Sequence, residues 1–296
     1  MRSHPHCPTV SLGIGPRPMY SSIGYRQVEG ISRRRRFISA TMFKQPWPST
    51  LWLIRHGQSA GNVARYAAEA AGELRIDIAD RDIDVPLSPL GQRQSEALGR
   101  WFSRLPPAEQ PQVVVCSPYS RALGTARHVI TQAGLRAEQL RQDERLREKE
   151  FGIVDRYTPR GIADKYPELS EQRRHVGKFY FRPPGGESWC DVILRLRSLM
   201  EMVTREYEGK RVLIVAHQVI VNCMRYLMEH LDESAILEID RQGDVPNCAI
   251  TSYQLQPGTG EVDDMMKLDL LNFIAPMEDS GVPVTVEADA SAAPKP

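Results

Sequence analysis

The feature that most constrains the fold is a short apolar run that ends on an arginine and a histidine. Residues 51–54 read Leu-Trp-Leu-Ile, which predicts a buried β-strand, and Gly57 lets the chain turn sharply directly after it. Arg55 and His56 are therefore expected together at the carboxyl end of a strand. Open α/β sheets bind their ligands at this end of their strands, so the run predicts both a fold class and the place of a site.

Two further apolar runs end in the same way. The run at 113–116 is followed by a Ser-Pro pair typical of a helix start, which places Arg121 in the first turn of the next helix. The run at 212–216 is the most apolar strand candidate in the chain and ends at His217. If the three strands are parallel, four side chains converge around one oxyanion-sized hollow open to solvent: Arg55, His56, Arg121 and His217.

Five short motifs follow one another along the chain. They are Arg55-His56-Gly57, the Ser-Pro-x-x-Arg of Ser117 to Arg121, Leu146-x-Glu148 with Phe151-Gly152, Gly185-Gly186-Glu187-Ser188, and Ala216-His217. In type and order they resemble the histidine phosphatase superfamily, to which cofactor-dependent phosphoglycerate mutases also belong. A lone Arg-His-Gly would be weak evidence, whereas five motifs in order are specific. The resemblance covers roughly residues 50 to 270.

The resemblance implies a three-layer α/β/α fold with a mostly parallel central sheet, like that of phosphoglycerate mutase. We expect a disordered or poorly ordered basic extension at 1–48, a histidine phosphatase domain at 49–275 and a disordered acidic tail at 276–296. The segment at about 151–186 is charged, aromatic and interrupted by prolines, so it predicts short helices folded over the strand ends as a lid.

The net charge of +1 hides an uneven distribution. Residues 1–50 carry eight Lys or Arg against the single acid Glu29, a charge of +7, which leaves −6 for residues 51–296. The expected domain is thus mildly acidic and lacks the basic footprint of a nucleic-acid-binding protein. Whether residues 1–48 are a targeting segment or a mis-assigned start is open, since the segment is rich in Arg and Ser but interrupted by prolines.

Cysteine usage and hydropathy favour a cytoplasmic protein. The five cysteines show no short paired spacing, which argues against a zinc site and suggests reduced thiols. No run of eighteen or more apolar residues occurs, so we expect no membrane-spanning segment. A homodimer is possible, and the sequence leaves the oligomeric state open.

The convergent side chains suit phosphoryl transfer. Arg55 and Arg121 can clamp phosphate oxygens with planar forks of donors, and their charge should keep a neighbouring imidazole unprotonated. His56 is the expected nucleophile, with its other ring nitrogen held as a donor by a main-chain carbonyl near Gly57. His217 would stabilise charge in the transition state, and no metal or other cofactor is expected.

The remaining site candidates rest on the resemblance. Glu148 stands where the family carries its acidic residue and would protonate the leaving alcohol, with Glu150 as its rival. Asn62, Gln58 and the main-chain N–H of Gln218 are expected to contact phosphate or substrate. The acidic segment at 77–84 lacks the glycine and glutamate of a calcium loop, so a solvated loop is expected there.

The resemblance implies a metal-independent phosphomonoesterase of the histidine acid phosphatase type that acts through phosphorylated His56 on a small phosphorylated substrate. A phosphoglycerate mutase is the first alternative, although the 35 residues from Gly152 to Gly186 look short for the insertion of such mutases. A catalytically silent phosphate-binding or scaffold protein is the second. Sugar phosphates, nucleotides, phosphoglycerates and phosphoproteins share the same terminal group, so the sequence does not identify the substrate.

Overall fold

A computed structural model describes residues 46–258 and 265–287, so the expectation for the basic extension lies almost wholly outside the described residues. The described part contains one six-stranded sheet in the order β3-β2-β4-β1-β5-β6. Strands β3, β2, β4 and β1 are parallel, and β5 and β6 form an antiparallel hairpin at the edge. The strands are β1 (Thr50–Arg55), β2 (Val113–Cys116), β3 (Leu140–Gln142), β4 (Arg211–Ala216), β5 (Ile250–Gln256) and β6 (Met265–Phe273). The expected mostly parallel sheet is confirmed.

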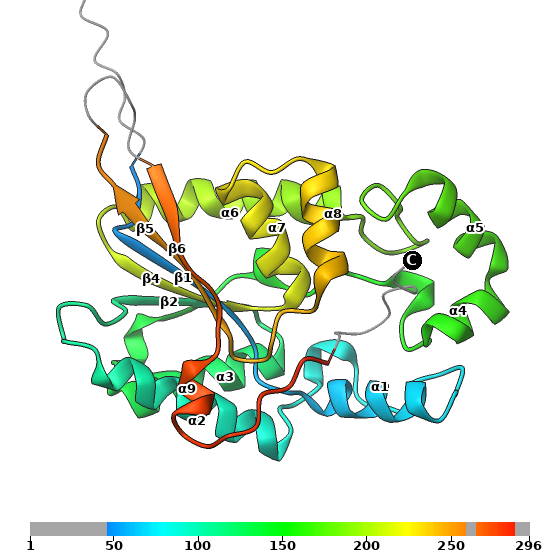
Figure 1. The fold of residues 1–296 in the computed structure, drawn as a ribbon, viewed down its shortest axis with the longest axis horizontal. Coiled ribbons are helices and arrows are strands. Elements are labelled where there is room, and N and C mark those ends of the chain that lie inside the picture. Colours follow the sequence, from blue (N-terminus) through cyan, green and yellow to red (C-terminus); the bar gives the residue numbers. More distant parts are fainter. Residues whose placement is uncertain (1–45, 259–264, 288–296) are drawn as a thin grey trace, which may run out of the picture. The chain divides into compact units, whose positions relative to one another are not determined.

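Helices cover both faces of the sheet (Figure 1). One face carries α2, α3 and α9, and the other carries α6, α7 and α8. The helices are α1 (Ala60–Ala70), α2 (Pro89–Arg104), α3 (Ser120–Ala133), α4 (Pro159–Lys165), α5 (Pro167–Val176), α6 (Trp189–Glu206), α7 (Gln218–Met228), α8 (Glu233–Gln242) and α9 (Ala275–Glu278). The three-layer α/β/α architecture expected from the sequence is therefore present.

Strand β1 shows why its sequence is apolar without interruption. Leu51 and Leu53 pack into the core beneath α6 and α7, while Trp52 and Ile54 pack into the core beneath α2 and α3. Successive side chains of a strand point to opposite faces of the sheet. A strand covered on both faces must therefore be apolar at every position.

Several helices begin at the residues that their caps predict. The hydroxyls of Ser59, Ser88 and Ser188 accept backbone N–H bonds at the starts of α1, α2 and α6. Two local expectations need correction. Helix α3 starts at Ser120 with Tyr119 as its N-cap, so the cap is not Ser117. The Gly-Gly-Glu-Ser motif predicts Glu187 in the first turn of a helix, where its charge would complement the helix dipole, but Glu187 precedes the cap of α6 and binds Arg195.

The segment expected as a lid forms a small subdomain beyond the carboxyl ends of the strands, near α1 (Figure 1). Helices α4 and α5 pack on a separate apolar cluster of Phe151, Val154, Ile162 and Leu169. An isolated bridge between Arg75 and Tyr157 pairs this subdomain with the segment after α1. The expectation of short helices and no main-sheet strand in this segment agrees with the structure.

The tail does not become disordered at residue 276 as expected. Helix α9 buries Met277 completely, and Val282 and Val284 pack against the core beneath α2 and α3. Backbone bonds and side chains hold the chain onward to Glu287. The prediction failed because a few well-placed apolar residues anchor a segment whose composition is otherwise polar and proline-rich. The rest of the tail lies outside the described residues.

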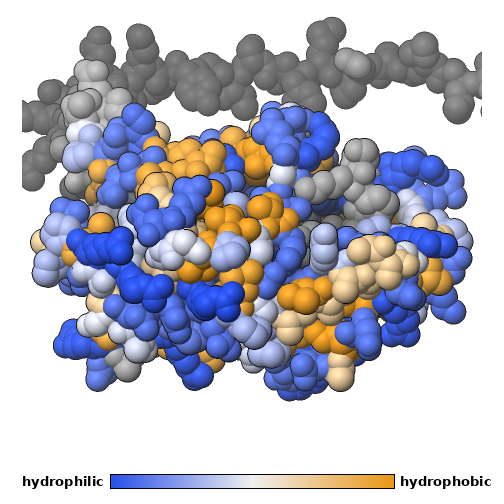
Figure 2. Space-filling model, turned by 60° about the horizontal axis from the view of Figure 1, so that its bottom comes forward, coloured by the Kyte–Doolittle hydropathy of each residue, from blue (hydrophilic) through white to orange (hydrophobic). Residues whose placement is uncertain are grey.

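Surface properties fit an ordinary globular domain. Figure 2 shows polar and apolar residues interspersed on the side of α1 and α2, and the exposed large apolar side chains of α1 include Val63 and Tyr66. Within the described residues, every helix is too short or too polar to span a lipid bilayer.

Candidate active site

The parallel pairing of β1 and β4 brings their terminal side chains together. Arg55 is in register with Ala216, and the His56 backbone N–H donates to the Ala216 carbonyl at 2.9 Å. The rings of His56 and His217 consequently lie 5.2 Å apart between centroids, inclined by 67°. Strand β2 is the other neighbour of β4 and leads into α3, which supplies Arg121.

The hydrogen bonds of His56 define its tautomer. Its Nδ1 lies 2.7 Å from the carbonyl oxygen of Gly57, and because a carbonyl only accepts, Nδ1 carries the proton. Its Nε2 accepts a hydrogen bond from the Nε of Arg121 at 3.3 Å. Nε2 is therefore unprotonated and lies beside a cationic side chain that can bind phosphate oxygens, an arrangement that suits a nucleophile for a phosphate ester.

Gly57 is needed for this turn. A Cβ atom at this position would lie 2.5 Å from the carbonyl oxygen of Gly91 and 2.9 Å from the hydroxyl of Ser95, so no larger residue fits. The N–H of Gly57 donates to the hydroxyl of Thr125 on α3. The turn is thus locked to α2 and α3, which fixes the orientation of His56.

Arg121 is bound by Asp82, a residue of the acidic segment at 77–84. Its Nη1 donates to the main-chain oxygen of Asp82 at 2.6 Å and lies 3.0 Å from the Asp82 carboxylate. Asp82 begins a short 3₁₀ turn, Asp82–Asp84. The expected solvated loop is wrong for this residue, because Asp82 is an ion-pair partner of the candidate phosphate clamp.

His217 joins two elements of the site. Its Nε2 lies 2.8 Å from the hydroxyl of Ser117, and its Nδ1 lies 3.5 Å from the Glu148 carboxylate. Glu148 also accepts the backbone N–H of Lys149 at 2.7 Å and is completely buried. The rival Glu150 is exposed and contacts the hydroxyl of Tyr119 at the edge of the site.

The end of the described tail reaches the same site. The guanidinium of Arg55 donates to the main-chain oxygens of Val245 and Glu287. The amide of Gln58 donates to both oxygens of the Glu287 carboxylate, at 2.8 and 2.9 Å. Thr285 is hydrogen-bonded to Asn247, whose amide in turn donates to the carbonyl of His56. The segment 282–287 is therefore bonded to the loop that carries the candidate nucleophile.

Burial is the main difference from the expected open hollow. Arg55, His56, Glu148 and His217 are 0% exposed, and Arg121 is 4% exposed. The structure thus represents a closed arrangement in which oxygens of Asp82 and Glu287 bind the two arginines. A phosphate ester can reach Nε2 of His56 only if part of this cover moves.

The weaker site candidates have clear local roles. The side-chain oxygen of Asn62 accepts from the N–H and hydroxyl of Ser59, which completes a capping box at the start of α1. Gln218 begins α7, and its side chain donates to Asp244. Both residues are buried beside the turns that carry His56 and His217.

Burial also shifts the pKa values of ionisable groups around the site. Burial, with the nearby Glu150 carboxylate as a smaller cause, raises the pKa of Tyr119 well above its usual value. Burial lowers the pKa of Lys149 to about 8, partly offset by the Glu148 carboxylate. In the described part of the chain, no group of three or more His, Cys, Asp or Glu side chains is placed to hold a metal ion.

Sequence reasoning missed three contacts. Asp82, Ser117 and Glu287 respectively pair with Arg121, His217 and Gln58, although they lie 39, 100 and 229 residues away in sequence. Two of them had a signal in the sequence: four carboxylates in eight residues stand out around Asp82, and Ser117 begins the Ser-Pro-x-x-Arg motif.

Comparisons with known proteins identify the family. The family model of the histidine phosphatase superfamily (branch 1) matches residues 51–267. A 6-phosphofructo-2-kinase/fructose-2,6-bisphosphatase of Caenorhabditis elegans is 30% identical over 223 residues, 72% of this chain and 43% of that protein. A 2,3-bisphosphoglycerate-dependent phosphoglycerate mutase 2 of Gloeobacter violaceus is 29% identical over 201 residues, 66% of this chain and 83% of that protein.

Coverage of the relatives is uneven. The chain spans about two fifths of the nematode protein and of a probable fructose-2,6-bisphosphatase of Schizosaccharomyces pombe. Among solved structures, the native mycobacterial glucosyl-3-phosphoglycerate phosphatase is 25% identical with a TM-score of 0.58, covering 76% of this chain and 99% of that one. A second structure, named mycobacterial hydrolase 1, has the same identity and TM-score.

Proposed function

This chain belongs to the histidine phosphatase superfamily (branch 1), and from that premise we propose that it is a metal-independent phosphomonoesterase acting through a phosphohistidine at His56. The observation that carries the proposal is the setting of His56, whose Nδ1 donates to the Gly57 carbonyl while Nε2 faces Arg121. The phosphatase names among the relatives support hydrolysis. The finer designation as a histidine acid phosphatase stays a prediction, as do a cytoplasmic location and a homodimer.

In the first half-reaction, Nε2 of His56 attacks the phosphorus atom. The N–P bond forms while the bond from phosphorus to the leaving alcohol oxygen breaks. Arg121 and Arg55 would exchange their contacts with Asp82 and Glu287 for phosphoryl oxygens, because a phosphate dianion is a stronger acceptor for a guanidinium fork than a carbonyl. His217 would donate to an equatorial oxygen as negative charge shifts.

Glu148 is proposed to handle protons in both half-reactions. Its protonated carboxyl would give a proton to the departing alkoxide, and the resulting carboxylate would take one from the water that attacks phosphohistidine. The N–P bond then breaks and inorganic phosphate leaves. The position of Glu148 in the buried layer beside His217 supports this role over Glu150, which lies at the surface.

A phosphoglycerate mutase is the second candidate, because the Gloeobacter mutase shares two thirds of this chain and most of its own length with it. A mutase would use the same first half-reaction and then return the phosphoryl group to a bound phosphoglycerate. The two activities differ only in whether water or an alcohol accepts the group.

One assay separates these functions. Phosphate release from a panel of small phosphoesters is measured at several pH values for wild type and His56→Ala. Release that the substitution abolishes supports the phosphatase, whereas transfer between phosphoglycerates with little release supports the mutase. Binding of phosphate without any turnover would indicate a silent phosphate-binding or scaffold protein.

A further inference from the structure

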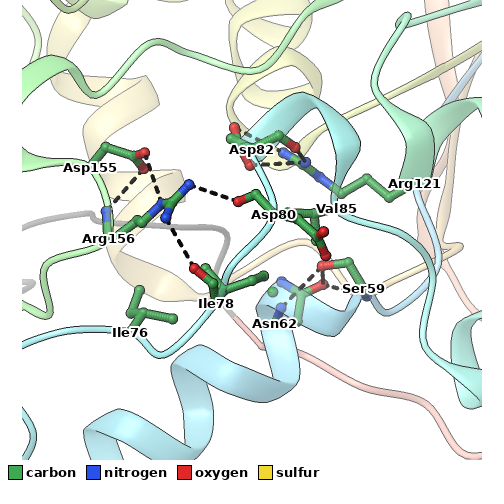
Figure 3. Close-up of a pocket in the computed structure, with 11 residues that line it drawn as sticks. Ser59, Asn62, Ile76, Ile78, Asp80, Asp82, Val85, Arg121, Asp155 and Arg156 are labelled. Atoms are coloured by element: carbon green, nitrogen blue, oxygen red, sulfur yellow. Dashed lines mark hydrogen bonds and ion pairs between the residues drawn. The ribbon is translucent and has the colours of Figure 1, made fainter.

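A small pocket lies beside Arg121 (Figure 3). It has a volume of about 40 Å³ and is enclosed by the start of α1, the segment 76–85 and the first residues of the lid. Its lining includes Asn62, Ile78, Asp82, Arg121, Asp155 and Arg156. On this measure roughly 10–15 Å³ is enough for one water molecule, so the pocket has room for a small polar group such as a hydroxymethyl group.

The pocket adjoins the proposed reaction centre through one side chain. Arg121 lines it and also donates to Nε2 of His56, which does not line it. An in-line displacement places the leaving oxygen on the side of phosphorus away from the nucleophile. A phosphoryl group held between His56 and Arg121 would therefore direct its leaving alcohol toward this pocket.

The pocket carries more negative than positive charge. Asp80, Asp82 and Asp155 face two cations, Arg121 and Arg156. The Nη1 of Arg121 lies 3.0 Å from the Asp82 carboxylate. The guanidinium of Arg156 donates to the carbonyls of Ile78 and Asp80 and lies 3.8 Å from the Asp155 carboxylate.

Figure 3 shows Asp82 next to Arg121 and Asp155 next to Arg156, and both aspartates line the pocket. The pKa of Asp155 is raised mainly by burial and then by the charge of Asp82, so the two carboxylates act on each other. An anionic group of a substrate placed between Asp82 and Asp155 would be repelled by both carboxylates. Hydroxyl groups, in contrast, can donate to carboxylate oxygens.

Resting on the proposed phosphatase function, we infer that this pocket selects esters whose leaving alcohol bears a neutral hydroxyl group and rejects those whose leaving alcohol bears a carboxylate or a second phosphate. Asp82 is the principal specificity residue, because it is the carboxylate nearest to the phosphate clamp. Asp155 contributes from the lid side. Polyol and sugar phosphates are the substrate class that fits this charge pattern.

Glycerol 3-phosphate and 3-phosphoglycerate provide a matched pair of probes. They share a three-carbon skeleton and differ in a hydroxymethyl group versus a carboxylate. The measured quantity is the ratio of kcat/KM for glycerol 3-phosphate to kcat/KM for 3-phosphoglycerate. We expect this ratio to be at least about 10 in wild type. Asp82→Asn should reduce this ratio about fivefold, since it removes a like charge within a few ångströms of the carboxylate.

Two variants make the ratio interpretable. Asp155→Asn should lower the kcat/KM ratio about threefold and leaves the ion pair of Arg121 intact. This variant therefore tests the inference even if Asp82→Asn fails to fold. Asp77→Asn is the matched control, because Asp77 is an exposed carboxylate of the same segment that does not line the pocket. The control should leave the ratio unchanged.

Failures of the inference and of the proposed function are distinguishable. If neither ester nor p-nitrophenyl phosphate releases phosphate, the phosphatase proposal fails and the inference falls with it. If turnover occurs but wild type prefers 3-phosphoglycerate, or the ratio is the same in both pocket variants as in wild type, the inference is overturned while the phosphatase proposal stands.

Discussion

The Nε of Arg121 lies 3.3 Å from the Nε2 of His56, although the two residues follow different strands and are 65 positions apart. The same guanidinium is paired with Asp82 through its terminal nitrogens. One arginine therefore connects the candidate nucleophile, an acidic segment and the pocket beside the start of α1. This arrangement makes Arg121 the residue through which binding and chemistry are expected to be coupled.

Replacing Arg121 by lysine tests the need for a planar fork. Lysine keeps the charge but loses the paired donors, so kcat/KM for any turned-over ester should fall about 100-fold while the fold is retained. Steady-state kinetics and circular dichroism check this. Arg127→Lys on the exposed side of α3 is the control, and an equal loss in both variants would contradict the role of Arg121.

Glu287→Ala tests whether the tail competes with substrate. The Glu287 carboxylate occupies the amide of Gln58, and its charge repels a phosphate dianion near Arg55. Removing it should lower KM about twofold to fivefold and leave kcat nearly unchanged, because only the closed state loses a contact. Glu278→Ala, an exposed acid on α9, should have no effect. A higher KM in Glu287→Ala would show that the carboxylate assists binding instead.

Lys149 makes stability depend on pH in a defined direction. Its side chain is 8% exposed, and burial lowers its pKa from 10.5 to about 8. Between these two pH values the unfolded chain binds more protons than the folded chain, so the free energy of unfolding rises from pH 8 to pH 10.5. The cost of burying the charged ammonium group is therefore greatest below pH 8. Lys149→Met removes this cost.

The expected gain from Lys149→Met is therefore larger at pH 7 than at pH 10.5, by up to about 3 kcal/mol in the free energy of unfolding. Urea unfolding of both proteins at the two pH values measures it. An identical difference between variant and wild type at both pH values would show that Lys149 is not buried as a cation.

The cysteines test the packing of the described fold. Cys116, Cys223 and Cys248 are 0% exposed, and burial raises the pKa of the Cys116 and Cys248 thiols to about 12. In a Cys7→Ser variant, only the partly exposed Cys190 should react with a thiol reagent at pH 8, and the other three should react after unfolding. Rapid reaction of several thiols in the native protein would contradict the packing.

Local pattern was enough to predict buried strands of an α/β sheet, and the family resemblance implied the three-layer order. The uninterrupted apolar runs of β1 and β4 require cover on both faces, which implies helices on both sides of a parallel sheet. The hydroxyls of Ser59, Ser88 and Ser188 mark helix starts because a cap acts within three residues. Interactions over such short ranges are visible in a sequence.

The closing of the site could not be predicted in this way. The contacts of Glu287 with Arg55 and Gln58 span more than 200 residues and depend on Val282 and Val284 docking on a distant core. Ser117 looked like a helix cap because its neighbours are typical of one, but tertiary contact with His217 takes its hydroxyl. Local composition carries no information about such partners.

The central claim is that the phosphoryl group passes through His56, and an alkali-quenched phosphoenzyme assay tests it most directly. Enzyme mixed with a ³²P-labelled substrate is quenched within milliseconds into alkali, which preserves phosphohistidine, and the labelled peptide is identified by mass spectrometry. The account predicts label on the peptide that contains His56 and none in His56→Ala, which should also lose turnover. Steady turnover of the same substrate with no label at His56, or with His56→Ala still active, would contradict it.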